Sequence, residues 1–414
     1  RYAERDTTLR EHTALIKEYY GYHEFGDFPW SFRLKRLLYT RAWLSNERPG
    51  LMFDFATAWL LQNKVLLPGA TTLVRLISEI RERANQRLWK KLAALPNKWQ
   101  AAQVMELLVI PEGQRVSALE QLKKGPVTVS GPAFNEALER YIRLRSLEFS
   151  RLNFSGLPAI QLRNLARYAG MASVKYIARM PQQRKLAVLT AFVKAQEITA
   201  LDDAVDVLDM LILDIIREAK KTGQKKRLRT LKDLDQAALL LARACALLLD
   251  DNTDVPDLRQ VIFKCVPKNR LAESVSKVNE LARPQNNNFH DEMVEQYGRV
   301  KRFLPAVLRD LHFRAAPAGE HVLAAIHYLA ELNGSKKRIL DDAPEHIITG
   351  PWKRLVYDAE GRIQRAGYSL CLLERLQDAL RRRDIWLENS DRWGDPREKL
   401  LQGEEWQTQR IPVC

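Results

Sequence analysis

Apolar residues recur at helical spacing along most of this chain. They appear at Leu34, Leu37 and Leu38, and again at Leu73 and Leu76, which places each set on one face of a helix. The clearest candidate for a β-hairpin is formed by residues 354–357 and 362–365, which flank a turn at 358–361. The pattern therefore predicts an all-α fold of several helical modules, with at most one short β-hairpin.

Proline and glycine clusters divide the pattern. Pro111-Glu112-Gly113, Gly125-Pro126 and Gly131-Pro132 punctuate short segments between longer helical stretches, and such clusters mark turns. The sequence is thus predicted to form three helical modules, at residues 1–124, 125–265 and 266–414.

Residues 163–229 have the order expected of a helix-turn-helix unit. Two short helices at 162–168 and 173–179, broken at Gly170, precede a long amphipathic helix after Pro181. In such a unit the second helix can enter the major groove of DNA. The side chains offered to base edges would be Ser173, Lys175, Tyr176 and Arg179. A packed helical corner with solvated lysines is the alternative interpretation.

Charge favours a polyanionic partner. The formal net charge is +15 and the pI is about 9.6, which is typical of nucleic-acid binding, although ribosome-associated and membrane-surface proteins share it. No apolar run is long enough to span a bilayer. The four cysteines are widely spaced without a CxxC pair, as expected of reduced cytosolic thiols.

Two further basic stretches are predicted to contact phosphates. The first is the helical face that carries Arg75, Arg83 and Arg87, for which a merely solvated face is the alternative. The second is the run at 220–229, where Gly223 suggests a helix end and a solubilising connector is the alternative. Its cations are Lys220, Lys221, Lys225, Lys226, Arg227 and Arg229.

Five aspartates along one predicted helix resemble a metal site at first sight. They are Asp202, Asp203, Asp206, Asp209 and Asp214. Two-metal chemistry draws its carboxylates around closely spaced ions, normally from separate elements, so we expect a solvated or ion-pairing face. His312, His321 and His327 lack metal-ligand spacing. No metal ligand and no catalytic residue is predicted in the chain.

Four segments resemble the Tn-three family of replicative DDE transposases. They are VLLPGATTLVRL at 65–76, RKLAVLTAFVKAQEITALDDAVDVLDMLIL at 184–213, the Leu-rich and Ala-Ala-Pro segment at 305–333, and YSLCLLERLQDALRRRDIWLENSDRWGDP at 368–396. The last is the sharpest match. Where the family more often has Gly, this chain has Arg383 and Asn389.

The resemblance implies a function. In that family the N-terminal region recognises the terminal inverted repeats of the transposon, and the catalytic DDE domain follows a segment like 368–396. The chain, which starts without Met, is therefore expected to be the N-terminal and central non-catalytic part of such an enzyme. We expect no cofactor in the chain, Mg²⁺ for the catalytic domain, homodimers, a location in the bacterial cytoplasm at the nucleoid, and neither a membrane nor a small-molecule substrate.

Double-stranded DNA is the implied partner, and the predicted contacts combine the basic stretches with the helix-turn-helix candidate. Besides the residues named above they include Arg163, Arg167, Arg184 and Lys185. Two other functions remain open at this point. One is a helical protein-interaction scaffold with generic nucleic-acid affinity. The other is a nuclease that uses the aspartates at 200–214.

Overall fold

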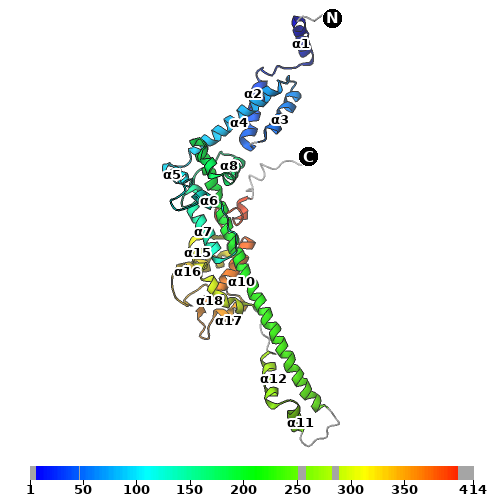
Figure 1. Ribbon diagram of the computed structural model, residues 1–414, viewed down its shortest axis with the longest axis vertical. Coiled ribbons are helices and arrows are strands. Elements are labelled where there is room, and N and C mark those ends of the chain that lie inside the picture. The colour runs from blue at the N-terminus through cyan, green and yellow to red at the C-terminus, as the bar shows by residue number, and fades with distance from the viewer. Residues whose placement is uncertain (1–5, 46, 250–257, 282–288, 400–414) are drawn as a thin grey trace. The chain divides into compact units, whose positions relative to one another are not determined.

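The computed structural model describes residues 6–45, 47–249, 258–281 and 289–399. It confirms a predominantly helical protein. The chain forms two compact units, and Figure 1 labels most of their helices. The first combines Arg1–Gly125 with Glu139–Leu201, and the second combines Pro126–Leu138 with Asp202–Cys414. These units cut across the three predicted modules.

The first unit begins with four helices. They are α1 (Asp6–Tyr20), α2 (Trp30–Ser45), α3 (Pro49–Gln62) and α4 (Ala70–Ala93). Leu34 and Leu38 of α2 pack with Leu73 and Ile77 of α4 in one buried cluster, as the helical spacing predicted, whereas Leu37 is exposed. Gly69 precedes α4 as its N-cap residue. Burial of one apolar face of each helix stabilises this bundle.

Shorter helices complete the first unit. They are α5 (Lys98–Glu106), α6 (Ala118–Lys123), the later part of α7 (Gly131–Arg145), η1 (Phe149–Arg151), α8 (Ala159–Met171), α9 (Val174–Ala178) and the start of α10 (Gln182–Leu248). Leu88 and Leu92 of α4 share a core with Ala187 of α10, against which Leu162 and Leu165 of α8 pack. This core fixes α8 beside α4 and the start of α10.

The second unit contains the rest of α10 and the remaining elements. Its helices are α11 (Leu258–Cys265), α12 (Lys268–Leu281), α13 (His290–Glu295), α14 (Tyr297–Val300), α15 (Leu304–Asp310), η2 (Pro317–Gly319), α16 (Glu320–Glu331), η3 (Glu345–Ile347), α17 (Gly350–Val356), α18 (Arg365–Arg382) and η4 (Pro396–Lys399). Trp352, Tyr368 and Phe303 are fully buried in it.

Strands in the described residues form two short antiparallel pairs instead of one local hairpin. β1 (Phe313–Ala315) pairs with β4 (Ile385–Leu387), and β2 (Ile339–Leu340) pairs with β3 (Ile363–Gln364). At the predicted hairpin only a single bridge joins Tyr357 to Ile363. The partners are distant in sequence, so local turn signals cannot reveal them.

Helix α10 corrects the expectation that Gly223 ends a helix. The helix runs without interruption from Gln182 to Leu248. A Cβ on Gly223 would lie 3.5 Å from the Glu292 carboxylate of α13, so the glycine marks a close approach between helices. The apolar segment at 231–249 is therefore the end of α10. Among its described side chains, Leu239 and Leu248 are exposed and Ala237 is buried.

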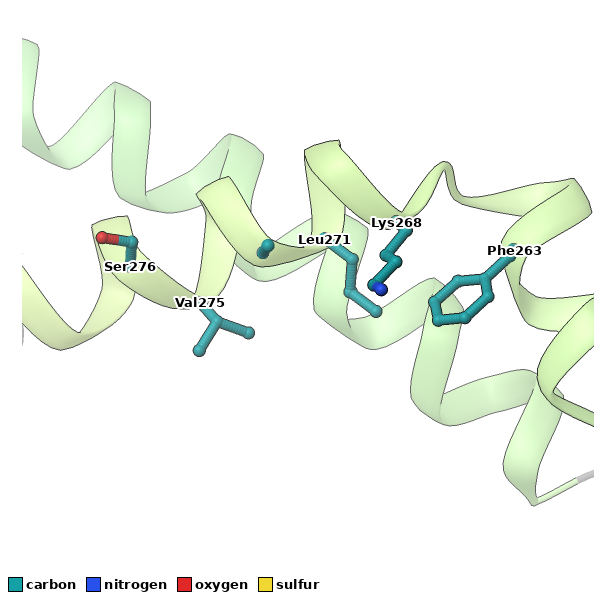
Figure 2. Close-up of a pocket in the computed structure, with 6 residues that line it drawn as sticks. Phe263, Lys268, Leu271, Val275 and Ser276 are labelled. Carbon is teal, nitrogen blue, oxygen red and sulfur yellow. The ribbon is translucent and has the colours of Figure 1, made fainter.

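The helices after α10 leave an apolar surface open. Phe263 of α11 and Leu271 and Val275 of α12 line a pocket of about 510 Å³ together with Lys268, Ala272 and Ser276 (Figure 2). No helix in the described part of the chain is both long and apolar enough to cross a membrane.

Candidate nucleic-acid interface

The helix-turn-helix candidate corresponds to α8 and α9, with a break that lies a few residues after the predicted one. Gly170 lies inside α8, which runs to Met171, and the chain turns at Ala172 and Ser173. The Ser173 hydroxyl accepts a hydrogen bond from the Tyr176 amide at 3.3 Å and so caps α9. The sequence placed the break at Gly170 because glycine weakens helices, but packing of the neighbouring Ala169, which is fully buried, keeps this turn helical.

Hydrogen bonds fix this corner to the rest of the first unit. Lys123 of α6 donates to the Ala172 carbonyl at 2.6 Å, in the turn itself. The buried Gln161 amide donates to the Ala42 carbonyl at 2.8 Å and thereby ties α8 to α2. Ile177 of α9 is fully buried. The corner is thus a packed part of the fold, and its outer face is presented in a fixed orientation.

That outer face is basic. Arg163 and Arg167 lie one turn apart on α8, and Lys175 lies one turn before Arg179 at the end of α9, all four exposed. Tyr176 is also exposed, and its ring meets Tyr168 edge-on at 6.4 Å. None of these four cations forms an ion pair with a carboxylate of the described residues. We call these four cations the corner cations.

Two predicted contact residues have aromatic partners inside the unit. The half-buried Arg184 guanidinium lies 4.9 Å from the Trp89 ring centroid and 5.9 Å from that of Tyr168. Arg87 lies over Trp43 at 5.1 Å. Cation–π packing of this kind holds helices together. Lys185 is half-buried, whereas Arg75 and Arg83 of α4 are exposed.

The stretch of chain that contains the corner has an unusual composition, which the search for motifs overlooked. Residues 149–196, between Glu148 and Glu197, contain no Asp or Glu. They contain eight Lys and Arg residues: Arg151, Arg163, Arg167, Lys175, Arg179, Arg184, Lys185 and Lys194. We call residues 149–196 the acid-free segment. Cations without local carboxylates produce a positive potential that attracts anions.

The cationic run at 220–229 lies in the second unit and has partners there. Lys226 pairs with Glu295 at 2.9 Å and with Glu292 at 3.5 Å, and the hydrogen bond that it donates to Glu295 is the main cause that raises the pKa of Lys226. Lys220 lies over the Phe289 ring at 4.8 Å. Lys221 and Lys225 are exposed. The side chains of Arg227 and Arg229 lie outside the described residues.

The aspartates of α10 form a row of ion pairs, which confirms the structural interpretation. Arg392 bonds Asp206 and Asp203, the latter at 2.8 Å, and lies 3.5 Å from the nearly buried Asp202. Arg381 clamps both oxygens of Asp209 at 2.9 Å. We call Asp202, Asp203, Asp206 and Asp209 the aspartate row.

Burial has the largest effect on the pKa of Asp206 in this row. It raises the pKa of Asp206, against the opposing effects of the Trp393 indole, which donates to that carboxylate at 2.7 Å, and of Arg392. No group of three or more His, Cys, Asp or Glu side chains among the described residues is arranged to hold a metal ion. The row serves to attach the segment that follows α18 to α10.

That segment contains the two positions where glycine was expected from the resemblance. Arg383 and Asn389 both have a φ of 64°, the left-handed conformation that glycine adopts without strain. The turn between them also contacts the 305–333 segment: the Ala316 amide donates to the Asp384 carbonyl at 2.9 Å. A Cβ on Gly319 would lie 2.4 Å from that same oxygen. Two distant segments singled out by sequence thus form one structural junction.

Known proteins resemble the chain over most of its length. A domain of unknown function (DUF4158) matches residues 1–80. The transposase of transposon Tn4556 from Streptomyces fradiae is 32% identical over 329 residues, which cover 73% of this chain and 37% of that protein. The transposase of transposon Tn501 from Pseudomonas aeruginosa is 29% identical over 407 residues, 98% of this chain and 41% of that protein.

A third relative extends the same pattern. The transposase of transposon Tn21 from Escherichia coli is 26% identical over 422 residues, which cover 100% of this chain and 42% of that protein. The chain therefore spans about two fifths of the length of these relatives.

Proposed function

Because the chain belongs to the Tn-three family of transposases, we propose that it binds the terminal inverted repeats of a transposon as duplex DNA and assembles the two ends for transposition. The observation that carries this proposal is the acid-free segment with its four exposed corner cations. Exposed cations that form no ion pair with the described residues are available to an external anion, and phosphate groups are ligands that suit them.

The geometry favours phosphate contact for most of the corner. Helix α9 has only five residues, so it presents few side chains to a groove, and the Ser173 hydroxyl is engaged in its cap. Tyr176 and Lys175 remain the best candidates for base edges. Arg163 and Arg167 on α8, with Arg75 and Arg83 on α4, would track the DNA backbone and fix the position of the protein.

The second unit would serve as a scaffold for assembly. The exposed Leu239 and Leu248 of α10 and the apolar pocket beside Phe263 support a homodimer through this region. In this proposal the protein acts in the bacterial cytoplasm at the nucleoid. Strand cleavage with Mg²⁺ would belong to a DDE domain, and no such chemistry is assigned to these 414 residues.

A binding titration tests the proposal. Duplexes with the terminal inverted repeats of Tn501, Tn21 and Tn4556, and shuffled duplexes of equal composition, are titrated at several salt concentrations. We expect preference for at least one repeat and a steep salt slope. Arg163→Ala with Arg167→Ala should reduce that slope by up to about 2, since each phosphate contact contributes about 0.9.

Controls separate the alternatives. Lys226→Ala removes a cation that is paired with Glu292 and Glu295, and it should leave the slope nearly unchanged. Sedimentation of the complex gives the number of chains on each duplex. Equal affinity for repeats and shuffled duplexes would instead favour a protein-interaction scaffold with generic nucleic-acid affinity.

A further inference from the structure

A second exposed stripe lies on α2 and the turn before it, away from the residues that sequence motifs singled out. Phe32, Lys35 and Arg36 follow one another at spacings of three and one residues, which places them on one face of α2. Phe28 lies in the turn before the helix, and its ring lies beside that of Phe32. The opposite face carries the fully buried Leu34 and Leu38. The stripe therefore points away from the core of the bundle.

The two phenylalanines are unusually exposed. Phe28 is 82% and Phe32 is 56% exposed, and their ring centroids lie 6.1 Å apart. Large apolar side chains are rarely left in water in pairs, and an exposed pair of this kind marks a contact surface. No described residue covers this pair.

The charge beside the rings indicates what covers them. Residues 28–46 contain no Asp or Glu but contain Arg33, Lys35, Arg36 and Arg41. Lys35 and Arg36 are exposed and have no ion pair among the described residues. The single carboxylate at the edge of the stripe, Asp27, accepts the Glu24 amide at 3.1 Å. A polyanion with flat apolar groups fits this surface better than a protein.

We propose that Phe28 and Phe32 form an aromatic wedge that inserts at a base step of the bound duplex, while Lys35 and Arg36 hold the adjacent phosphates. Wedges of this type unstack a base step from the minor groove and bend the DNA. The inference rests on the proposed DNA-binding function, because it concerns how the first unit deforms the duplex that it binds.

The test places 2-aminopurine at successive positions of the inverted-repeat duplex that binds best and measures fluorescence with the full chain. The wild-type protein should raise the fluorescence at one base step, where stacking is lost. Phe28→Ala with Phe32→Ala should abolish this rise and weaken binding about tenfold, the order expected for loss of base–aromatic stacking. The salt slope should stay unchanged, because the cations remain.

Matched variants keep the result interpretable. Leu61→Ala removes a 60% exposed apolar side chain from α3, a helix without Lys or Arg, and should leave the fluorescence rise intact. Phe32→Trp should also retain it. Because both rings are exposed, all variants should have the same thermal midpoint as the wild type. Equal midpoints then show that the variants are folded.

The outcomes distinguish the wedge from the function on which it rests. Tight repeat binding with no fluorescence rise at any position, or a rise that persists in the double variant, overturns the wedge and leaves DNA binding intact. Absence of binding by the wild-type chain to every duplex overturns both.

Discussion

The acid-free segment and the aspartate row differ in whether the fold pairs their charged side chains. The acid-free segment presents Arg163, Arg167, Lys175 and Arg179 to solvent without carboxylate partners in the described residues. The aspartate row is instead matched by Arg392 and Arg381. Charges that the fold pairs with one another stabilise the fold, whereas charges that it leaves open are available to an external ligand.

The largest expected effect is on the stability of the fold, when the ion pairs of the aspartate row are broken. Arg392→Ala would leave Asp202, Asp203 and Asp206 close together without their shared cation. We expect the free energy of unfolding to fall by about 1–3 kcal/mol, below the value for a fully buried pair because the Arg392 side chain is half exposed. Urea denaturation followed by circular dichroism measures the change.

Matched variants complete that experiment. Arg354→Ala breaks an exposed pair with Asp291 and should cost less than about 1 kcal/mol. Lys175→Ala with Arg179→Ala should leave stability within about 0.5 kcal/mol. If the corner variant were as destabilising as Arg392→Ala, the corner cations would have an internal role and the comparison would fail.

A smaller effect concerns Glu197, the carboxylate that ends the acid-free segment. It is 3% exposed and one of its oxygens has no hydrogen-bond partner. Burial raises its pKa, against the opposing effects of Lys194 and Ser150. A raised pKa means that the fold favours the protonated acid. This contribution to stability is present below the unfolded pKa and is lost as the pH rises through the folded pKa.

Glu197→Gln should therefore stabilise the first unit at pH 7. The difference between variant and wild type should shrink as the pH falls towards about 4, the range of an unperturbed glutamate. Thermal midpoints recorded at a series of pH values measure it. Glu139→Gln, at an exposed position of the same unit, serves as the control for the substitution itself and should leave the thermal midpoint at pH 7 nearly unchanged. A constant gain for Glu197→Gln at every pH would contradict a titrating origin.

The sequence predicted the helices well but not how they end or what they contact. Periodicity identified the faces of α2 and α4, because burial of Leu34 and Leu73 imposes it. The helix ends predicted at Gly170 and Gly223 were wrong, because both glycines lie inside helices. Helical propensity is weak, and packing overrides it. The β1–β4 pair joins segments about seventy residues apart, and no local pattern encodes such a register.

The sequence likewise predicted only part of the candidate site. The helix-turn-helix pattern singled out Lys175 and Arg179, which are exposed, but the sequence could not show that Lys226 has carboxylate partners in α13. Nor could it show that Arg392 meets Asp206, 186 residues earlier in the chain. The absence of acids from 149–196 was readable from the sequence alone, although it did not show that Arg151 pairs with Glu148 just before the segment.

The smallest expected effect concerns Arg383, in the turn that joins α18 to the segment held by the aspartate row. Arg383 adopts φ 64° and stacks over Trp393 at 5.1 Å. Arg383→Gly and Arg383→Ala both remove this stack, but only alanine keeps a Cβ in the left-handed region. The glycine variant should therefore be more stable than the alanine variant by about 1 kcal/mol, since the left-handed penalty is about 1–2 kcal/mol and the flexibility of glycine offsets part of it.

Paired urea denaturation curves of the two variants measure this difference. Asn389 also has a φ of 64°. Asn389→Gly should therefore likewise be more stable than Asn389→Ala, because only alanine keeps a Cβ in the left-handed region. If alanine equalled glycine at both positions, the left-handed conformation would not explain the glycine that the resemblance leads us to expect there. The junction between Asp384 and Gly319 would then remain as the constraint on this segment, because the 2.4 Å approach leaves no room for a Cβ at Gly319 whatever the conformation of residue 383.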